Sequence, residues 1–160
     1  MAERLAAVLR FRTVTPGAAE ENQDLGAFAA MQGYLQNAFP KAHAGLDVEQ
    51  IGDANAVLMA WHGQECSSAL PWMFVSHQDV VPVDNEKLWR HPPFSGMLAE
   101  GHVWGRGALD LKVTMTAVLE AVESLLDEGF RPRRSVYLAF GGDEESGDGH
   151  GRRSFRWRVG

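Results

Sequence analysis

The chain has 160 residues, of which 45% are hydrophobic and 22% charged, and its formal net charge is −6. This length and composition suit one folded domain, and the negative charge argues against nucleic acid or an anionic membrane as a partner, because both bind excess Lys and Arg. Cys66 is the single cysteine, which excludes an internal disulfide and a zinc site built from several cysteines.

The N-terminal part is predicted to be mainly helical. A short helix is expected from Ala2 to about Arg10. Apolar side chains recur every three or four residues from Leu25 to Phe39, which predicts a longer amphipathic helix ended by Pro40. The first residues lack the apolar core and small-residue cleavage site of a signal peptide, and no apolar run is long enough to span a bilayer. A cytoplasmic location is therefore expected.

Three apolar runs are too short for helices and are predicted to be buried strands. They are AVLMAW at 56–61, WMFVS at 72–76 and SVYLAF at 135–140. The third run is continuously apolar, as expected of a central parallel strand covered on both faces.

The remaining segments complete the expected fold. A long loop is expected from Pro82 to Glu100, and an apolar stripe from Leu111 to Leu126 predicts a helix closed by Gly129. The order of helices and strands favours the α/β class, with a mostly parallel sheet flanked by helices.

Acidic residues and one histidine follow the ends of strands or turns. These residues are His77, Asp79, Asp110, Asp143, Glu144 and Glu145. In open α/β sheets, ligands bind at the carboxyl ends of the strands. One imidazole with several carboxylates suits Zn, Mn or Co, and clustered carboxylates repel one another unless a cation lies between them. The pattern therefore predicts a metal site.

The chemistry of such a site suggests separate roles. A carboxylate can bridge two metal ions through its two oxygens, and Asp110 is the candidate for this role. Asp79, two residues after His77, is placed to orient the imidazole ring. Glu144 and Glu145 cannot easily point the same way, so one would ligate a metal while the other acts as a general base. The sequence pattern leaves open which glutamate does which.

Each motif also has an ordinary structural interpretation. A histidine at a strand end is more often a hydrogen-bonded surface residue than a ligand. An acidic triplet is usually a solvated loop or a helix N-terminus, and GRGALD can be a turn whose Asp110 caps the next helix. The joint pattern of the three motifs, rather than any one of them, favours the metal site.

Four motifs in order, SHQDVVPV, LWRHPPFSG, GHVWGRGALDLK and FGGDEESG, lie between about residue 70 and residue 147. They resemble the co-catalytic zinc metallopeptidase family of aminoacylase, carboxypeptidase S, glutamate carboxypeptidase and succinyl-diaminopimelate desuccinylase, and the spelling SHQDVVPV is most similar to the carboxypeptidase S branch. The resemblance implies that His77 ligates one metal, Asp110 bridges both and Glu145 ligates the second. It also implies that Glu144 is the general base and that Asp79 orients His77.

The resemblance further implies a substrate and a cofactor. The expected reaction is hydrolysis of an amide bond next to a free carboxylate, in a peptide or an N-acyl amino acid. Two zinc ions are expected, with cobalt or manganese as alternatives. No nucleic-acid or membrane partner is expected.

Family members are much longer than this chain. Residues 1–148 are therefore expected to be the N-terminal portion of a zinc-peptidase catalytic domain, without the lid domain and without two further metal ligands. Residues 149–160 form an atypical basic tail, which ends in the sequence GRRSFRWRVG. Our hypothesis is that a frameshift near Gly149 to Gly151 produced this tail. The alternative function is a truncated, catalytically incompetent fragment.

Overall fold

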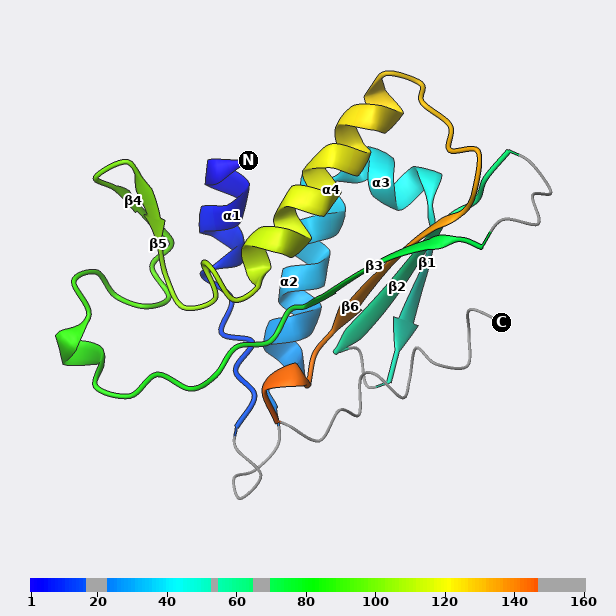
Figure 1. Cartoon of the computed structure of the whole chain (residues 1–160). Coiled ribbons are helices and arrows are strands. Elements are labelled where there is room, and N and C mark those ends of the chain that lie inside the picture. The colour runs from blue at the N-terminus through cyan, green and yellow to red at the C-terminus, as the bar shows by residue number, and fades with distance from the viewer. Residues whose placement is uncertain (17–22, 53–54, 65–69, 147–160) are drawn as a thin grey trace.

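A four-stranded sheet packs against helices on one of its sides (Figure 1). The computed structural model describes residues 1–16, 23–52, 55–64 and 70–146, so the predicted tail at 149–160 lies outside the described residues. The strands are β1 (Asp47–Ile51), β2 (Ala56–Trp61), β3 (Trp72–His77) and β6 (Val136–Gly141), in the order β1-β2-β6-β3. The three strands predicted from apolar runs are confirmed to within one residue at each end.

The α/β class is confirmed, but the sheet is mixed rather than mostly parallel. Of the pairings among the described strands, β3 with β6 is parallel, whereas β1 with β2 and β2 with β6 are antiparallel. The sequence analysis did not predict β1, whose sequence DVEQI has only two apolar residues and is largely exposed. Only four residues separate β1 from β2, and so short a connection permits antiparallel pairing alone.

Within the part of the chain that the structure describes, four α-helices accompany the sheet. They are α1 (Ala2–Val8), α2 (Leu25–Ala38), α3 (Pro40–Gly45) and α4 (Lys112–Asp127). The predicted helices α1, α2 and α4 are confirmed, and α3 was missed. Pro40 follows the end of α2 as predicted, but it also occupies the first turn of α3. A main-chain N–H at this position would have no hydrogen-bond partner within the helix, so proline is tolerated there.

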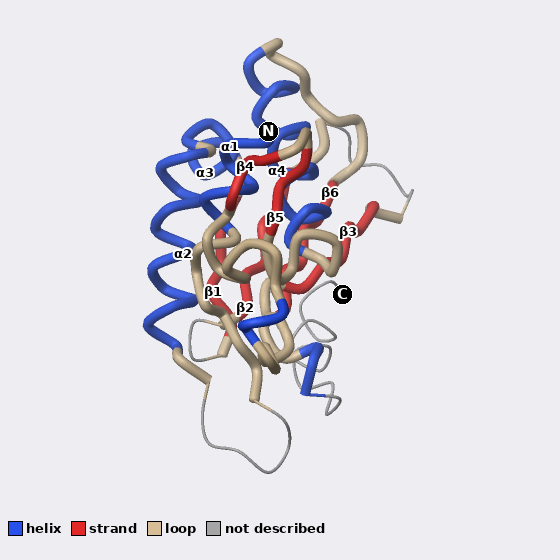
Figure 2. Tube along the Cα trace, turned by 90° about the vertical axis from the view of Figure 1, so that its left-hand side faces the viewer, coloured by secondary structure: helices blue, strands red, loops and turns tan. Residues whose placement is uncertain are grey.

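The helices lie together on one side of the sheet (Figure 2). Alternate side chains of the two central strands face them, among them Met59 and Leu138, which join Met31, Met115 and Leu119 in the main core. The intervening side chains of the same strands form a smaller cluster on the other face. This alternation is the period of two expected of a strand.

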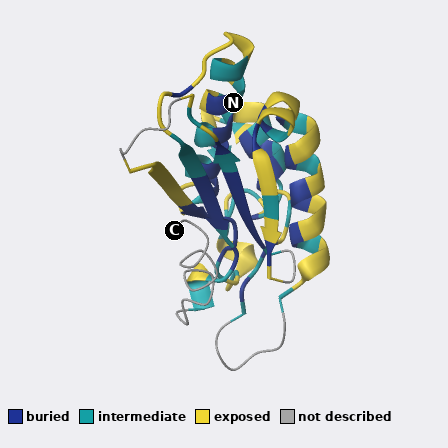
Figure 3. Ribbon diagram, turned by 90° about the vertical axis from the view of Figure 1, so that its right-hand side faces the viewer, coloured by how far each residue is buried: buried dark blue, intermediate teal, exposed yellow. Residues whose placement is uncertain are grey.

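The edge strand β3 is the least covered of the four (Figure 3). Trp72 is 57% exposed and Val75 is 63% exposed, although the same strand ends in two buried residues, Ser76 and His77. Among the described residues, β3 therefore presents an apolar surface to solvent at one end and delivers polar groups into the interior at the other.

The prediction of a long loop from Pro82 to Glu100 was wrong in part, because this segment contains regular structure. A 3-10 turn spans Glu86–Leu88, and β4 (Met97–Ala99) pairs with β5 (His102–Trp104) in a small hairpin. Three-residue strands are too short to show a periodic pattern in sequence. No helix within the described ranges is long and apolar enough to cross a membrane.

Candidate metal centre

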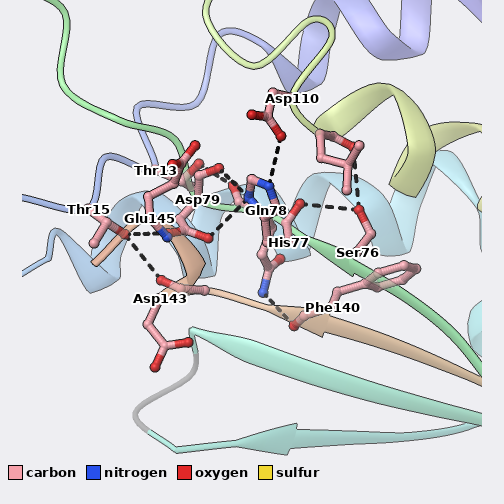
Figure 4. A network of polar contacts seen from close by, with 12 residues as sticks. Thr13, Thr15, Ser76, His77, Gln78, Asp79, Asp110, Phe140, Asp143 and Glu145 are labelled. Atoms are coloured by element: carbon pink, nitrogen blue, oxygen red, sulfur yellow. Dashed lines mark hydrogen bonds and ion pairs between the residues drawn. The ribbon is translucent and has the colours of Figure 1, made fainter. Parts of the chain in front are cut away.

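The parallel pair of strands sets the position of two predicted site residues. His77 ends β3 and lies opposite Gly141 at the end of β6. Glu145 follows in a 3-10 turn, Glu144–Ser146, directly beyond that strand. Because the carboxyl ends of β3 and β6 lie side by side, His77 and Glu145 come together (Figure 4), as expected for a ligand site in an α/β sheet.

Asp110 approaches the same point from a third element, the glycine-containing turn before α4. Its Oδ1 lies 3.1 Å from Nε2 of His77. Ligand atoms of His77, Asp110 and Glu145 all lie within 4.8 Å of one another. The His77 side chain is 8% exposed and that of Asp110 is 79% exposed, so the cluster has a buried floor and a side open to solvent.

The local structure does not support the ordinary interpretation of Asp110 as a helix cap. Helix α4 begins at Lys112, its N-cap residue is Leu111, and no side chain caps it. The turn itself requires Gly107, whose φ is +82° and whose added Cβ would meet Val80 at 2.6 Å. This close approach holds the turn against the loop that follows β3.

Asp79 is fully buried and lies beside the other nitrogen of the imidazole ring. Nδ1 of His77 is 3.1 Å from the main-chain oxygen of Asp79 and 3.4 Å from its Oδ1. A proton on Nδ1 therefore meets two acceptors, and a second proton on Nε2 meets Oδ1 of Asp110. Loss of the Nε2 proton leaves the tautomer protonated on Nδ1, whose Nε2 lone pair can bind a metal.

The charges in the cluster shift the pKa values of its members. Burial alone would lower the pKa of His77, but the carboxylates of Asp79 and Asp110 outweigh it and raise the pKa to about 9. Burial, together with the negative charges of Asp110 and Asp79, raises the pKa of Glu145 despite the opposing effect of His77. The cluster thus retains a proton to balance its carboxylates, and a divalent cation would serve the same purpose.

Glu144 lies directly before Glu145 in the same turn, but its side chain is exposed. It is not among the three residues whose ligand atoms converge. The two adjacent glutamates therefore have different surroundings.

Sequence reasoning missed several residues that surround the site. Thr13 and Thr15 are buried and contact the loop after β3, and Lys112 is buried with its Nζ 2.9 Å from the main-chain oxygen of Phe11. Burial lowers the pKa of Lys112 to about 7, although Asp79 opposes this. Lys112 ends the motif GHVWGRGALDLK, which gave this residue no role of its own. Thr13, Val14 and Thr15 alternate between polar and apolar side chains, but three residues are too few to predict a strand.

Comparison with known proteins identifies the family. The model of peptidase family M20/M25/M40 matches residues 73–156, more than half of the chain. The chain belongs to this family. The match includes His77, Asp110 and Glu145, and it confirms the resemblance inferred from the four sequence motifs.

Individual family members agree in sequence and in fold. The chain is 40% identical to probable carboxypeptidase S-like 2 of Dictyostelium discoideum, over 94% of this chain and 29% of that protein. It is 37% identical to an N-fatty-acyl-amino acid synthase/hydrolase of Mus musculus, over 89% of this chain and 28% of that protein. The crystal structure of an M20 family metallo-carboxypeptidase from Sulfolobus solfataricus superposes with a TM-score of 0.67 at 25% identity, covering 89% of this chain and 30% of that one. The chain therefore spans less than a third of the length of these M20 relatives.

Proposed function

We propose that this chain carries part of a two-metal site for hydrolysing amide bonds. The observation that supports the proposal most directly is the convergence of His77, Asp110 and Glu145, from three separate elements, to within 4.8 Å. One imidazole nitrogen and two carboxylates form a donor set suited to zinc, with cobalt or manganese as substitutes. The carboxylates of Asp79 and Asp110 outweigh burial and raise the pKa of His77 to about 9, and this concentration of negative charge supports a bound cation.

Each residue has a role that its surroundings support. His77 would hold one ion through Nε2, Glu145 would hold the second, and the exposed Asp110 would bridge them with its two oxygens. When bound, the two cations would polarise the scissile carbonyl and make water acidic enough to be deprotonated near neutral pH. The solvent-exposed Glu144 would take the proton from the attacking water and pass it to the leaving amine.

The proposed substrates are peptides or N-acyl amino acids cleaved at an amide bond next to a free carboxylate. This part of the proposal follows the relatives, which are named as a probable carboxypeptidase and as an N-fatty-acyl-amino acid synthase/hydrolase. We further propose that residues 1–148 are part of a catalytic domain and that 149–160 are a separate tail. The family match runs to residue 156, and residues 147–160 lie outside those described.

The test is metal content measured together with turnover. The purified chain is stripped with a chelator and loaded with zinc, and hydrolysis is followed on a panel of dipeptides and N-acyl amino acids. We expect two bound ions, and turnover that is abolished by Glu144→Gln but retained by Glu86→Gln, a control at an exposed glutamate in the loop before β4. Tight metal binding without turnover would reject hydrolysis and favour the catalytically incompetent fragment. No metal binding would reject the site.

A further inference from the structure

A segment near the N-terminus runs beside the loop that carries Asp79. Val14 forms a parallel bridge with Val80. The main-chain N–H of Thr15 donates to the oxygen of Val80 at 2.9 Å, and the N–H of Val80 donates to the oxygen of Thr13, also at 2.9 Å. The threonine side chains on either side of Val14 are buried, with Thr13 0% and Thr15 3% exposed. The bridge therefore places two hydroxyl groups against the site.

The hydroxyl of Thr15 contacts the Asp79 carboxylate directly. Its Oγ1 donates to Oδ2 of Asp79 at 2.7 Å, and the main-chain N–H of Glu145 donates to the same oxygen at 3.1 Å (Figure 4). The other oxygen, Oδ1, is buried and has no hydrogen-bond partner among the described atoms. Its charged neighbour is Nδ1 of His77, 3.4 Å away. One carboxylate oxygen is thus held by the protein, and the other is left for the histidine.

A glutamine fixes the direction in which the Thr15 hydroxyl points. Nε2 of Gln23 donates to Oγ1 of Thr15 at 2.6 Å and also to the main-chain oxygen of Gly142. The amide oxygen of Gln23 in turn accepts from Nδ2 of Asn55 at 2.7 Å. The Thr15 hydroxyl has two possible acceptors, Oδ2 of Asp79 at 2.7 Å and the main-chain oxygen of Gly142 at 3.3 Å. Because Thr15 accepts from Gln23, and because the Asp79 carboxylate is the closer and more strongly charged acceptor, the single hydroxyl proton of Thr15 is directed to Asp79.

We propose that Thr15 is a positioning residue for the metal site, which holds the Asp79 carboxylate so that Oδ1 faces Nδ1 of His77 and Nε2 stays free for a metal ion. This inference rests on the proposed function, because it assigns His77 as a ligand. Hydrogen bonds from Thr15 and from the main-chain N–H of Glu145 also favour the ionised form of Asp79, because both donate to its Oδ2. An ionised Asp79 is the form that accepts a hydrogen bond from the Nδ1–H group of His77.

The test compares three variants of the full chain. Thr15→Val removes the hydroxyl at nearly constant volume, and Thr15→Ser restores it. Thr13→Val is the matched control, because Thr13 lies in the same segment, is equally buried, and donates at 2.6 Å to the main-chain oxygen of Gln78 rather than to Asp79. Affinity for Co²⁺ is measured from its visible absorption. We expect Thr15→Val to bind cobalt about tenfold more weakly, because Asp79, the partner of the ligand His77, is no longer held in place. Thr15→Ser and Thr13→Val should bind cobalt as the unmodified chain does.

A second readout needs no metal. At a pH high enough for the ring to be neutral, nitrogen NMR of the metal-free chain reports which ring nitrogen carries the proton. Nδ1 has two acceptors on Asp79, the main-chain oxygen and Oδ1, whereas Nε2 has Oδ1 of Asp110. We therefore expect a larger fraction of the proton on Nδ1 in the unmodified chain and in Thr13→Val than in Thr15→Val. If Thr15→Val does not fold, Gln23→Leu takes its place. This substitution removes the hydrogen bond that orients the Thr15 hydroxyl, and Gln23 is less buried than Thr15.

The outcomes separate the two proposals. Unchanged cobalt affinity and unchanged tautomer in Thr15→Val would overturn the role of Thr15, as would an equal loss of affinity in Thr13→Val. If the unmodified chain binds no cobalt, the proposed function fails. The tautomer measurement then still decides whether Thr15 positions Asp79 and His77.

Discussion

Metal binding to this chain should depend steeply on pH, because the candidate ligand His77 holds a proton in the metal-free state. Burial lowers its pKa, but Asp79 and Asp110 outweigh burial and raise the pKa to about 9. Nε2 faces Oδ1 of Asp110 at 3.1 Å, so at neutral pH a proton lies where a metal ion would bind. A metal ion has to displace that proton.

The size of the effect follows from one displaced proton. Below pH 9 the apparent affinity should fall about tenfold for each pH unit, which is about 100-fold, or about 2.7 kcal/mol, between pH 9 and pH 7. Above pH 9 the affinity should level off, since the ring is already neutral. The direction is fixed because the folded, metal-free chain binds this proton more tightly than a free histidine, whose pKa is 6.5.

Isothermal titration calorimetry with zinc, in pairs of buffers that differ in ionisation enthalpy, counts the protons released. We expect about one proton per His77-bound ion at pH 7, declining towards zero above pH 9. His102→Gln serves as a control, because His102 is exposed and bonds only locally to the main-chain oxygen of Glu100. An affinity that stays constant between pH 7 and pH 9, without proton release, would refute the assignment of His77 as a protonated ligand.

Three further predictions concern neighbouring features. Replacing Asp79 with Asn should lower the pKa of His77 below about 9, because Asp79 is the main group that raises it; an unchanged pKa in an NMR titration of the ring would contradict this. The pKa of Lys112 falls from 10.5 to about 7 on folding, so between these values the unfolded chain binds the proton more tightly and stability falls as pH falls. As the pH falls through that window, the free energy of unfolding in urea should drop, relative to that of Lys112→Met, by at most about 1.4 kcal/mol per pH unit. Parallel stability curves for the two proteins would exclude a lowered pKa of Lys112. Val75→Lys should reduce self-association in sedimentation velocity, because it places a charge on the exposed edge strand β3; equal association of both chains would show that β3 is not the contact.

The secondary structure of the core was largely predictable because its signals are local. Apolar runs predicted β2, β3 and β6, and the spacing of apolar residues predicted α2 and α4. The strands that were missed, β1, β4 and β5, are short and half exposed. They form because a partner strand lies beside them, and a short sequence window does not contain that partner.

The candidate site divides in the same way. The residue types and the strand and turn ends pointed to His77, Asp110 and the pair Glu144 and Glu145, since metal ligands are chemically distinctive and cluster where parallel strands end. The family resemblance then implied that Glu145 is the ligand of the pair. Only the tertiary structure decided that β3 and β6 are parallel neighbours, which brings His77 and Glu145 together across 68 positions of sequence. It alone revealed that Thr15 bonds to Asp79, 64 positions away. A hydroxyl group has no preferred distant partner in sequence, because its hydrogen bond is specified by the packing that brings the two segments together.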